Sequence, residues 1–171
     1  MTPATISYTT VESPVGPLLV AGDDDALRLI HFVRAGRALP RDTDWQERDT
    51  TLLRDARRQL GEYFAGRLRE FQLPLAPRGS TFQQRVWRAL LEVPYGTTCS
   101  YADLARRLGD LRATRAVGAA NGRNPIPIVV PCHRVIGADG SLIGYGGGLD
   151  VKRYLLSLEG ALPDRDLFSN H

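Results

Sequence analysis

The sequence predicts an α+β protein, with α/β character in its first half, made of two small domains. Short β-branched runs between turn residues occupy residues 6–33, and apolar residues follow at helical spacing over 50–65. Short amphipathic helical patterns then dominate the second half. We therefore expect domains at 1–78 and 79–171. A chain of 171 residues is long enough for both to bury a core without disulfides.

Composition excludes several classes of protein. No run of eighteen apolar residues is present, and the N-terminus lacks a basic start followed by an apolar block, so we expect a cytoplasmic protein with no membrane contact. The only cysteines, Cys99 and Cys132, lie in unlike contexts and form no CxxC motif. This pattern argues against a disulfide framework or a zinc cluster. We expect no metal and no cofactor.

Positive charge is concentrated in one part of the chain. The net charge is only +3, and residues 1–78 hold eleven Arg against eleven acidic residues. Residues 79–134 hold eight Arg against three acidic residues. A basic segment beside a neutral one is typical of a protein that binds a polyanion such as nucleic acid, although a charged helix face is often just solvated.

The first half is predicted to be a sheet with one helix. Turn residues separate the strands, and Gly66 ends the helical pattern. No catalytic cluster is apparent in this half, and linker composition follows at Pro74–Gly79. The expected elements are strands at 6–11, 18–21 and 27–33, a loop at 34–50, a helix at 50–65 and a strand at 71–75.

The second half is predicted to begin with three helices. Two short helices joined by a Gly-containing turn, in the most basic segment, indicate a helix-turn-helix motif, although helical hairpins that bind no DNA are common. The expected helices are one from Thr81, in a capping box with Gln84, to about Val93, one at 101–108 capped by Ser100, and one at 115–121 capped by Thr114.

The third of these helices carries almost no side chains. Gly118 in a helix interior costs about 1 kcal/mol against Ala, so a close approach to the helix backbone is the expected compensation. Two partners fit: a neighbouring helix packed tightly, or a nucleic-acid backbone or minor groove. The turn Asn121–Pro125 follows.

The chemistry is predicted to centre on Cys132. Ile128–Val130 has the composition of a buried strand, and Pro131 is expected to end it and expose the next side chain at the rim of a sheet. His133 follows at once, and an imidazole or positive charge near a thiol favours the nucleophilic thiolate. A buried cysteine beside a satisfied histidine is the alternative.

Beyond Cys132 we expect a hairpin, a glycine loop and a final helix. The free N–H groups of the loop Gly144–Gly148 could hold an oxygen, or the loop could be only a linker. The expected elements are hairpin strands at 134–136 and 141–143 around an Asp-Gly turn, and a helix capped by Asp150, ended by Glu159, with Val151, Tyr154, Leu155 and Leu158 facing the core.

Together these residues resemble the O6-alkylguanine-DNA alkyltransferases, also called methylated-DNA–protein-cysteine methyltransferases, in their short bacterial form. The first half matches that family only in order and length. The resemblance implies a ribonuclease-H-like N-terminal domain and a winged-helix-like C-terminal domain. The matching segments are Phe82–Trp87, Pro94–Thr97, Arg115–Gly118, Asn121–Pro125, Pro131–Val135, Gly144–Leu149, Lys152 and Leu155–Glu159.

The resemblance implies direct DNA repair in a single turnover. An alkyl group moves irreversibly from the O6 atom of guanine in duplex DNA to Cys132, after the nucleotide is flipped out of the helix. His133 takes the thiol proton through a water, and Glu159 orients His133. Neighbouring residues in an extended chain point to opposite faces, which leaves room for that water. Activity on O4-alkylthymine stays open.

The resemblance also implies how DNA is held in the minor groove. Arg115 fills the gap left by the flipped nucleotide, Tyr101 helps to rotate it, and Tyr145 lies against O6. Asn124 braces the turn before Cys132, and the carbonyls of Cys132 and Val135 read the exocyclic amine. The residues assigned to DNA or base contacts are Tyr101, Arg115, Ala116, Gly118, Asn124, Val135, Tyr145 and Gly146.

Three other functions fit part of the pattern. A protein that binds alkylated lesions through this fold without transfer has tryptophan in place of the nucleophile, whereas Cys132 is present here. A Cys-His hydrolase would turn over many times, and a helix-turn-helix regulator would bind without transfer. We expect a monomer, and cooperative binding along DNA stays open. Some family members hold zinc through N-terminal cysteines, which this chain lacks.

Overall fold

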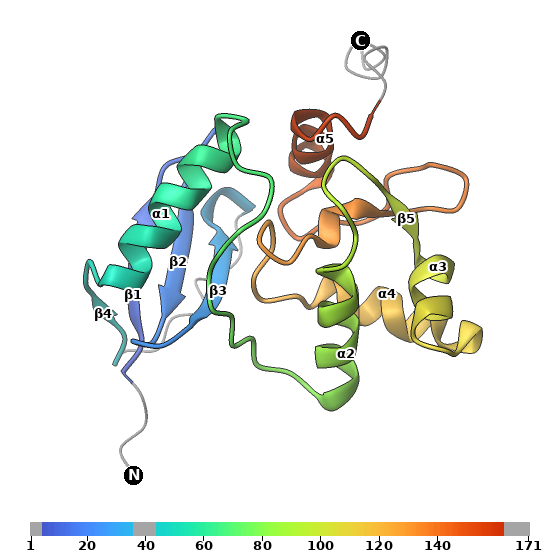
Figure 1. The fold of residues 1–171 in the computed structure, drawn as a ribbon, viewed down its shortest axis with the longest axis horizontal. Helices are drawn as coiled ribbons and strands as arrows, with labels where there is room; N and C mark the ends of the chain where they lie inside the picture. Colours follow the sequence, from blue (N-terminus) through green and yellow to red (C-terminus); the bar gives the residue numbers. More distant parts are fainter. Residues whose placement is uncertain (1–4, 36–43, 163–171) are drawn as a thin grey trace. The chain divides into compact units, whose positions relative to one another are not determined.

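The computed structural model describes residues 5–35 and 44–162. The chain divides into two compact units, Met1–Arg78 and Gly79–His171, called here the N-terminal and C-terminal units (Figure 1). Each contains its own secondary structure, so the molecule is of the α+β class. None of the described helices is both long and apolar enough to cross a membrane.

The N-terminal unit is a four-stranded sheet in the order β3-β2-β1-β4. β1, β2 and β3 pair antiparallel, and the short β4 pairs parallel with β1. β2 is buried along its whole length, because it lies between two neighbours in the sheet. The elements are β1 (Ser7–Val11), β2 (Leu18–Gly22), β3 (Leu27–Phe32), the 3-10 turn η1 (Val33–Ala35) and β4 (Gln46–Glu47).

Helix α1 (Thr51–Phe64) covers one face of this sheet (Figure 1). The Thr50 side chain accepts a hydrogen bond from Leu53 N at 3.2 Å and so caps the helix. The buried residues recur three or four positions apart, which is why the helical spacing in the sequence predicts this element correctly. They are Leu53, Ala56, Gln59, Leu60 and Tyr63.

Two expectations for the N-terminal unit were wrong. Residues 71–75 form no strand, because the side chain of Gln59 takes the backbone bonds of Gln72: Nε2 donates to Gln72 O at 3.0 Å and Oε1 accepts from Gln72 N at 2.8 Å. Only Leu75 makes an isolated bridge, to Leu27. The predicted loop 34–50 contains η1 and β4, and part of it, 36–43, lies outside the described residues.

The C-terminal unit is mainly helical. Helices α2, α3 and α4 pack on one another, and α3 and α4 are joined by the 3-10 turn η2 in the predicted helix-turn-helix arrangement. A two-stranded parallel sheet pairs β5 with β6. The elements are α2 (Thr81–Leu90), β5 (Cys99–Ser100), α3 (Tyr101–Arg107), η2 (Leu111–Ala113), α4 (Thr114–Gly122), η3 (Cys132–Arg134), β6 (Val135–Ile136) and α5 (Leu149–Leu158).

Helix starts agree with the sequence in one case and differ in two. Ser100 caps α3, as predicted, in a capping box with Asp103. The box that starts α2 is one residue earlier than predicted, on Ser80 and Gln83. Thr114 does not cap α4: it is the first helical residue, and its hydroxyl donates to Leu111 O at 2.6 Å.

The last helix also departs from the prediction at two points. Gly148, with φ 101°, occupies the N-cap position in place of Asp150, which lies in the first turn. Tyr154 is exposed, whereas the fully buried Lys152 faces the core. A pattern that counts only apolar residues cannot find a buried lysine. Glu159 follows the last helical turn and Gly160 adopts φ 74°, so the end of α5 is as predicted.

The chain around Cys132 is built from turns. Val130 N donates to Ile126 O at 2.9 Å, and Ile128 adopts φ 76°, so residues 128–130 form a turn and the predicted strand was wrong. Residues 141–143 form no strand either, because β6 pairs with β5, and the expected hairpin keeps only its turn. Turns can bury β-branched residues as completely as a strand does.

Candidate active site

Cys132 is a buried thiol in polar surroundings. It opens η3 and is 5% exposed, so the expectation that Pro131 would expose it at the rim of a sheet was wrong. Burial raises the pKa of the Cys132 thiol. Hydrogen bonding to Asn124 and Tyr145 and the charge of Lys152 oppose that shift and favour the thiolate.

The side chains of His133, in η3, and Glu159, at the end of α5, lie together. Both side chains are fully buried, and His133 Nε2 lies 2.7 Å from Glu159 Oε2. Burial alone would raise the pKa of Glu159, but hydrogen bonds from His133 and Arg134 outweigh it and hold this pKa at about 2. Glu159 is therefore an anion that accepts a hydrogen bond from the Nε2–H of His133. Residues 132–134 form a 3-10 turn, so the extended geometry expected for Cys132 and His133 was wrong.

The other ring nitrogen of His133 is placed to act as a base. Burial lowers the pKa of His133, with Glu159 acting in the opposite direction, so the imidazole is neutral near neutral pH. With the proton on Nε2, the lone pair is on Nδ1, which is buried and has no hydrogen-bond partner among the described residues. A buried thiol and a neutral imidazole base therefore follow one another in the chain.

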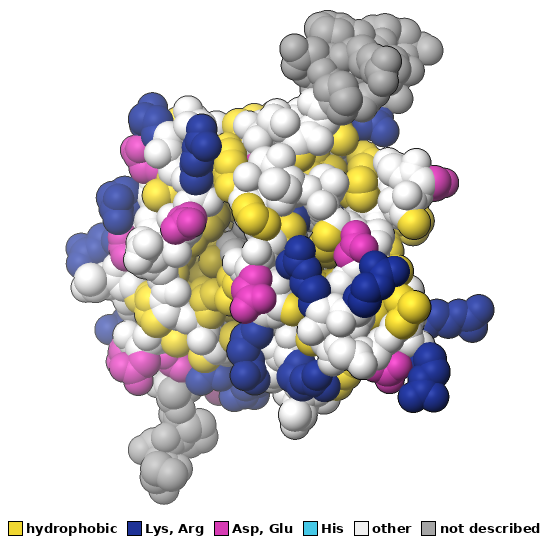
Figure 2. All heavy atoms as spheres, turned by 45° about the vertical axis from the view of Figure 1, so that its right-hand side comes forward, with side chains coloured by type: hydrophobic (Ala, Val, Ile, Leu, Met, Phe, Trp, Pro, Cys, Tyr) yellow, Lys and Arg dark blue, Asp and Glu magenta, His cyan; other side chains and the backbone are white. Residues whose placement is uncertain are grey.

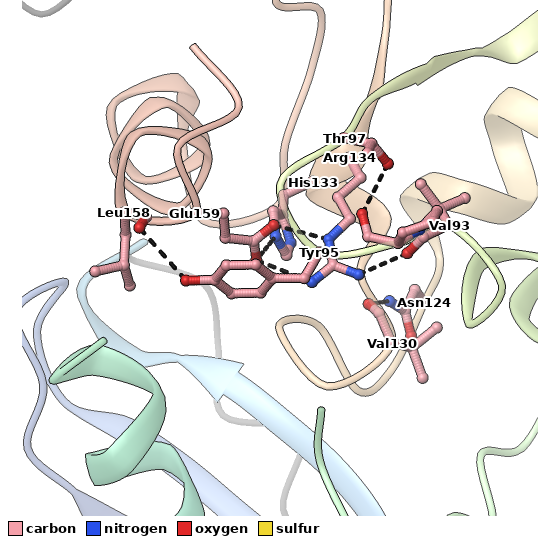
Figure 3. Close-up of polar contacts among 10 residues, drawn as sticks. Val93, Tyr95, Thr97, Asn124, Val130, His133, Arg134, Leu158 and Glu159 are labelled. Atoms are coloured by element: carbon pink, nitrogen blue, oxygen red, sulfur yellow. Dashed lines mark hydrogen bonds and ion pairs between the residues drawn. The ribbon is translucent and has the colours of Figure 1, made fainter. Parts of the chain in front are cut away.

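Arg134 completes the charged cluster, as Figure 3 shows. Its Nε and Nη2 donate to the two oxygens of Glu159 at 2.8 and 3.1 Å, and its Nη1 donates to Val93 O at 2.7 Å. The guanidinium also lies over the ring of Tyr95, 5.7 Å from its centre. The sequence interpretation assigned no role to Arg134, although this residue lies within the Pro131–Val135 segment.

Two asparagines hold the backbone around Cys132. Asn124 Nδ2 donates to Val130 O at 2.8 Å and its Oδ1 accepts from Ile126 N at 3.0 Å, so it spans the turn that precedes Cys132. Asn121, buried on α4, donates from Nδ2 to Cys132 O at 3.4 Å. No signal in the sequence distinguished Asn121 from the rest of its turn.

A loop from Ile143 to Gly148 forms another wall of the site. The Tyr101 hydroxyl donates to Ile143 O at 3.4 Å. Burial raises the pKa of Tyr101, and negative charge on Cys132 and on Cys99 adds to the shift. Tyr145 contacts Cys132, whereas Gly146 is exposed.

Lys152 joins this loop to the strand after Cys132. It is fully buried, and its Nζ donates to Val135 O at 2.7 Å, to Ile143 O at 3.0 Å and to Gly144 O at 3.5 Å. Val135, a predicted base contact, is itself buried. Lys152 matched the family pattern, but the sequence offered no reason to place its ammonium in the core.

The outer face of α4 is small and basic. Its exposed positions are Arg115, Ala116, Ala119, Gly122 and Arg123, so an arginine stands at each end of a bare stretch. Basic side chains outnumber acidic ones toward the lower right of the face shown in Figure 2.

Gly118 does not face a tightly packed neighbour. A Cβ atom there would meet only the ring of Tyr101, at 3.7 Å, which is an ordinary contact. Tight helix packing, the first of the two explanations for Gly118, is therefore not the reason that a glycine occupies this position.

This arrangement is suited to nucleophilic attack by sulfur. A thiol is followed in the chain by a neutral imidazole, which is bonded to a carboxylate held by an arginine, and these are the groups that a nucleophilic thiol and its base require. The described residues contain no group of three or more His, Cys, Asp or Glu side chains that could hold a metal ion.

Comparisons with known proteins match both units. The domain family described as "6-O-methylguanine DNA methyltransferase, ribonuclease-like domain" matches residues 6–77, and its "DNA binding domain" counterpart matches 81–161. The methylated-DNA–protein-cysteine methyltransferase of Methanosarcina acetivorans is 50% identical over 90% of this chain and 98% of its own length. The Mycolicibacterium paratuberculosis protein of the same name is 54% identical over 90% and 92%.

Solved structures agree. The O6-methylguanine methyltransferase of Mycobacterium tuberculosis is 49% identical and superposes with a TM-score of 0.85 over 96% of this chain and all of its own. The M. tuberculosis OGT structure in complex with DNA is 50% identical, with a TM-score of 0.82 over 95% and 99%. With both units matched and relatives near 50% identity, the chain belongs to the 6-O-methylguanine DNA methyltransferase family.

Proposed function

We propose that this protein repairs alkylated DNA directly, by moving the alkyl group from the O6 atom of guanine to Cys132. The bond between the alkyl carbon and O6 breaks as a bond from Sγ to that carbon forms. The resulting thioether is stable, so each molecule reacts once. A buried Cys132 thiol followed directly in the chain by a neutral, buried His133 is the observation that carries this proposal.

His133 and Glu159 supply the path for the thiol proton. Nδ1 of His133 takes that proton through a bridging water, and the imidazolium that forms is stabilised by Glu159 at 2.7 Å. Because Arg134 holds both oxygens of Glu159, the carboxylate keeps its orientation during the transfer. The proton ends on the guanine anion that is displaced from the alkyl carbon, so a neutral, unmodified guanine is restored within the DNA.

The loop that contains Tyr145 and Gly146 holds the leaving guanine. A hydroxyl and a backbone N–H aimed at O6 stabilise the negative charge that develops there as the alkyl carbon departs. The carbonyls of Cys132 and Val135 accept from the exocyclic amine of guanine. Cys132 follows the turn that Asn124 holds, and Val135, the first residue of β6, is held by Lys152.

Double-stranded DNA docks on the outer face of α4. Ala116, Ala119 and Gly122 let the backbone of the helix approach the minor groove, which is only about 6 Å wide. Arg115 fills the space of the flipped nucleotide, and Tyr101 steers that nucleotide toward Cys132. Each repair event needs one protein molecule, and we propose that the protein acts as a monomer.

One experiment separates this function from its rivals. Duplex DNA carrying radiolabelled O6-methylguanine is incubated with a sub-stoichiometric amount of protein, and protein-bound label is measured against time. We expect transfer to stop at one methyl group per protein molecule, and Cys132→Ala to accept none. Release of label in many turnovers would favour a hydrolase, and tight binding without transfer would favour a lesion-binding protein or a regulator.

A further inference from the structure

Lys152 is unusual in both sequence and structure. It is the only lysine in the chain, because the other 21 of the 22 basic residues are arginine. It is also fully buried, whereas lysine is among the residue types that proteins almost never bury completely. A chain that uses arginine everywhere else has lysine at the one cationic position that is fully buried among residues 5–35 and 44–162.

The three acceptors of Lys152 explain that choice. Nζ donates to the carbonyls of Val135, Ile143 and Gly144, at 2.7, 3.0 and 3.5 Å. An ammonium is a compact centre with three donors, which suits three oxygens converging on one point. A guanidinium is a flat fork that suits paired, parallel acceptors and would not fit the same position.

These contacts join two segments that share the active site. Val135 follows the turn of Cys132 in β6, whereas Ile143 and Gly144 begin the loop that contains Tyr145. The hydroxyl of Tyr101, from α3, reaches the same Ile143 carbonyl. Lys152 therefore fixes the position of the loop that contains Tyr145 relative to the Cys132 sulfur.

The charges around Lys152 belong to the active site. In η3, the positive charge of Lys152 lowers the pKa of the Cys132 thiol and that of the His133 imidazole. From α3, Tyr101 faces Lys152 across the shared carbonyl. On α5 itself, Asp150 is exposed and Arg153 is partly exposed. None of the hydrogen bonds described for Lys152 goes to a carboxylate, so no acidic side chain neutralises it directly.

We propose that Lys152 is a positioning residue for alkyl transfer, which holds the Tyr145 loop against the Cys132 turn and supplies the positive charge that favours the Cys132 thiolate. This inference rests on the proposed function. Burial lowers the pKa of Lys152 to about 8, with Cys132 acting in the opposite direction. The charge is therefore present below pH 8 and is lost as the pH rises through that value.

The first test measures the reactivity of the Cys132 thiol in the absence of DNA and of free guanine. The rate at which iodoacetamide alkylates Cys132 is followed against pH, with the adduct located by peptide mass, in the wild type and in Lys152→Met. Arg153→Met is the matched control, because it removes one positive charge from the neighbouring residue. We expect Lys152→Met to react about tenfold more slowly near pH 7.5, which corresponds to about one unit of thiol pKa.

The two parts of the proposal are separated by a third variant. Lys152→Arg keeps the charge but does not match the three carbonyls, so iodoacetamide should react nearly as with the wild type while reaction with free O6-benzylguanine falls. Wild-type rates with benzylguanine would contradict the positioning role. Identical iodoacetamide profiles for Lys152→Met and Arg153→Met would contradict the electrostatic role. Because iodoacetamide needs no repair activity, the electrostatic result does not depend on the proposed function, whereas reaction of the wild type with benzylguanine tests that function separately.

A second measurement serves if Lys152→Met does not fold. Protein grown with ¹³C-labelled lysine gives a single side-chain NMR signal, since the chain has one lysine. We expect its titration midpoint to fall when Cys132 is replaced by Ser, because the thiolate that stabilises the ammonium is lost. An unchanged midpoint would show that the two groups do not interact, and would overturn the electrostatic role.

Discussion

At the scale of single residues, the proposed active site depends on the negative charge of Glu159. Its two oxygens accept hydrogen bonds from Arg134 Nε, Arg134 Nη2 and His133 Nε2. All three are 3.1 Å or shorter and lie in the buried interior. A buried carboxylate is costly unless it is paired and hydrogen-bonded, and here both conditions hold. The same charge keeps the Nε2 proton in place and leaves Nδ1 of His133 free to act as the base.

Glu159→Gln should slow alkyl transfer and destabilise the fold. An amide can still bond to His133, but it leaves the Arg134 charge buried without an anion, which costs about 3 kcal/mol or more. Single-turnover rates on methylated duplex DNA and urea unfolding at pH 7 measure the two effects. DNA affinity should not change, since Glu159 is buried. A variant with the wild-type transfer rate would contradict the role of Glu159 in orienting His133.

The stability of the wild type should fall in acid for the same reason. Glu159 has a folded-state pKa of about 2 against an ordinary value of 4.5. Its contribution is complete above pH 4.5 and is lost as the pH falls from 4.5 toward 2. The difference in unfolding free energy between wild type and Glu159→Gln should therefore shrink over that range. A constant difference would mean that Glu159 is not the charged group assigned here.

The sequence could predict only part of this cluster. Cys132 and His133 stand next to each other, and Glu159 was identified through the family resemblance. Arg134 and Lys152 also lie in matching segments, but nothing in a linear sequence shows that two cations are buried or which carbonyls they contact. Those facts depend on η3 and α5 packing together, and only the fold brings these elements into contact.

At the scale of elements, α4 is built for close approach from outside. Gly118 lies in its interior, and the protein leaves room for a methyl group there. A helix accepts the lower propensity of glycine when something else needs the space. The open face of α4 makes DNA the partner that best explains this residue.

Gly118→Ala should raise stability while weakening repair. Helix propensity predicts a gain of up to about 1 kcal/mol in the free energy of unfolding, whereas the added methyl group would lie 3.7 Å from the ring of Tyr101, the residue proposed to steer the flipped nucleotide. The control is Gly61→Ala in α1, where a Cβ atom meets nothing within 4 Å. Both variants should melt at higher temperature, and only Gly118→Ala should bind duplex DNA more weakly. Equal DNA affinity would contradict the interpretation of Gly118.

The turn before Cys132 holds a strained residue. Ile128 has φ 76° and is 1% exposed, and a β-branched residue in this left-handed region costs about 1–2 kcal/mol. Its burial and the bonds of Asn124 hold it there. Strain of this kind is often found beside functional groups.

At Ile128, a glycine variant should be more stable than an alanine variant, which is the reverse of the usual order. Both Ile128→Ala and Ile128→Gly lose buried apolar surface, but only glycine also relieves the left-handed strain. We expect both variants to be less stable than the wild type, with Ile128→Gly unfolding at a higher urea concentration than Ile128→Ala. The opposite order would show that the backbone of this turn is not strained.

The sequence predicted the helices better than the strands. Helical spacing identified α1 and α2 because their buried residues recur with a regular period, and the Ser100 cap identified α3. The apolar run 128–130 and the alternation at 71–75 look the same in a turn as in a strand. What decides between them is the partner of the backbone groups, and here side chains of Gln59 and Asn124 take that place.

At the scale of the whole molecule, charge is divided between the two units. The excess of arginine lies in residues 79–134, which contain α2, α3 and α4. Arg106 and Arg112 pair with acidic neighbours, whereas Arg115 and Arg123 make no ion pair within the part of the chain that the structure describes. The arginines at the two ends of α4 are thus available to bind DNA phosphates or to fill the gap that a flipped nucleotide leaves in the duplex.

Arg115→Ala should impair repair of duplex DNA far more than reaction with a free base. Flipping is needed only when the lesion lies in a duplex, so free O6-benzylguanine should react at nearly the wild-type rate. The control is Arg54→Ala, an exposed arginine on α1. It removes the same charge and should leave both rates unchanged. Equal losses on the two substrates would remove the role assigned to Arg115.

The central claim is that the sulfur of Cys132 receives the alkyl group. The protein offers an internal comparison, because Cys99 is also free and buried, and burial raises its pKa. After reaction with duplex DNA containing O6-methylguanine, peptide mass analysis should find one methyl group on Cys132 in every reacted molecule and none on Cys99. Methylation of Cys99, or loss of the methyl group from DNA with Cys132 unmodified, would contradict the account.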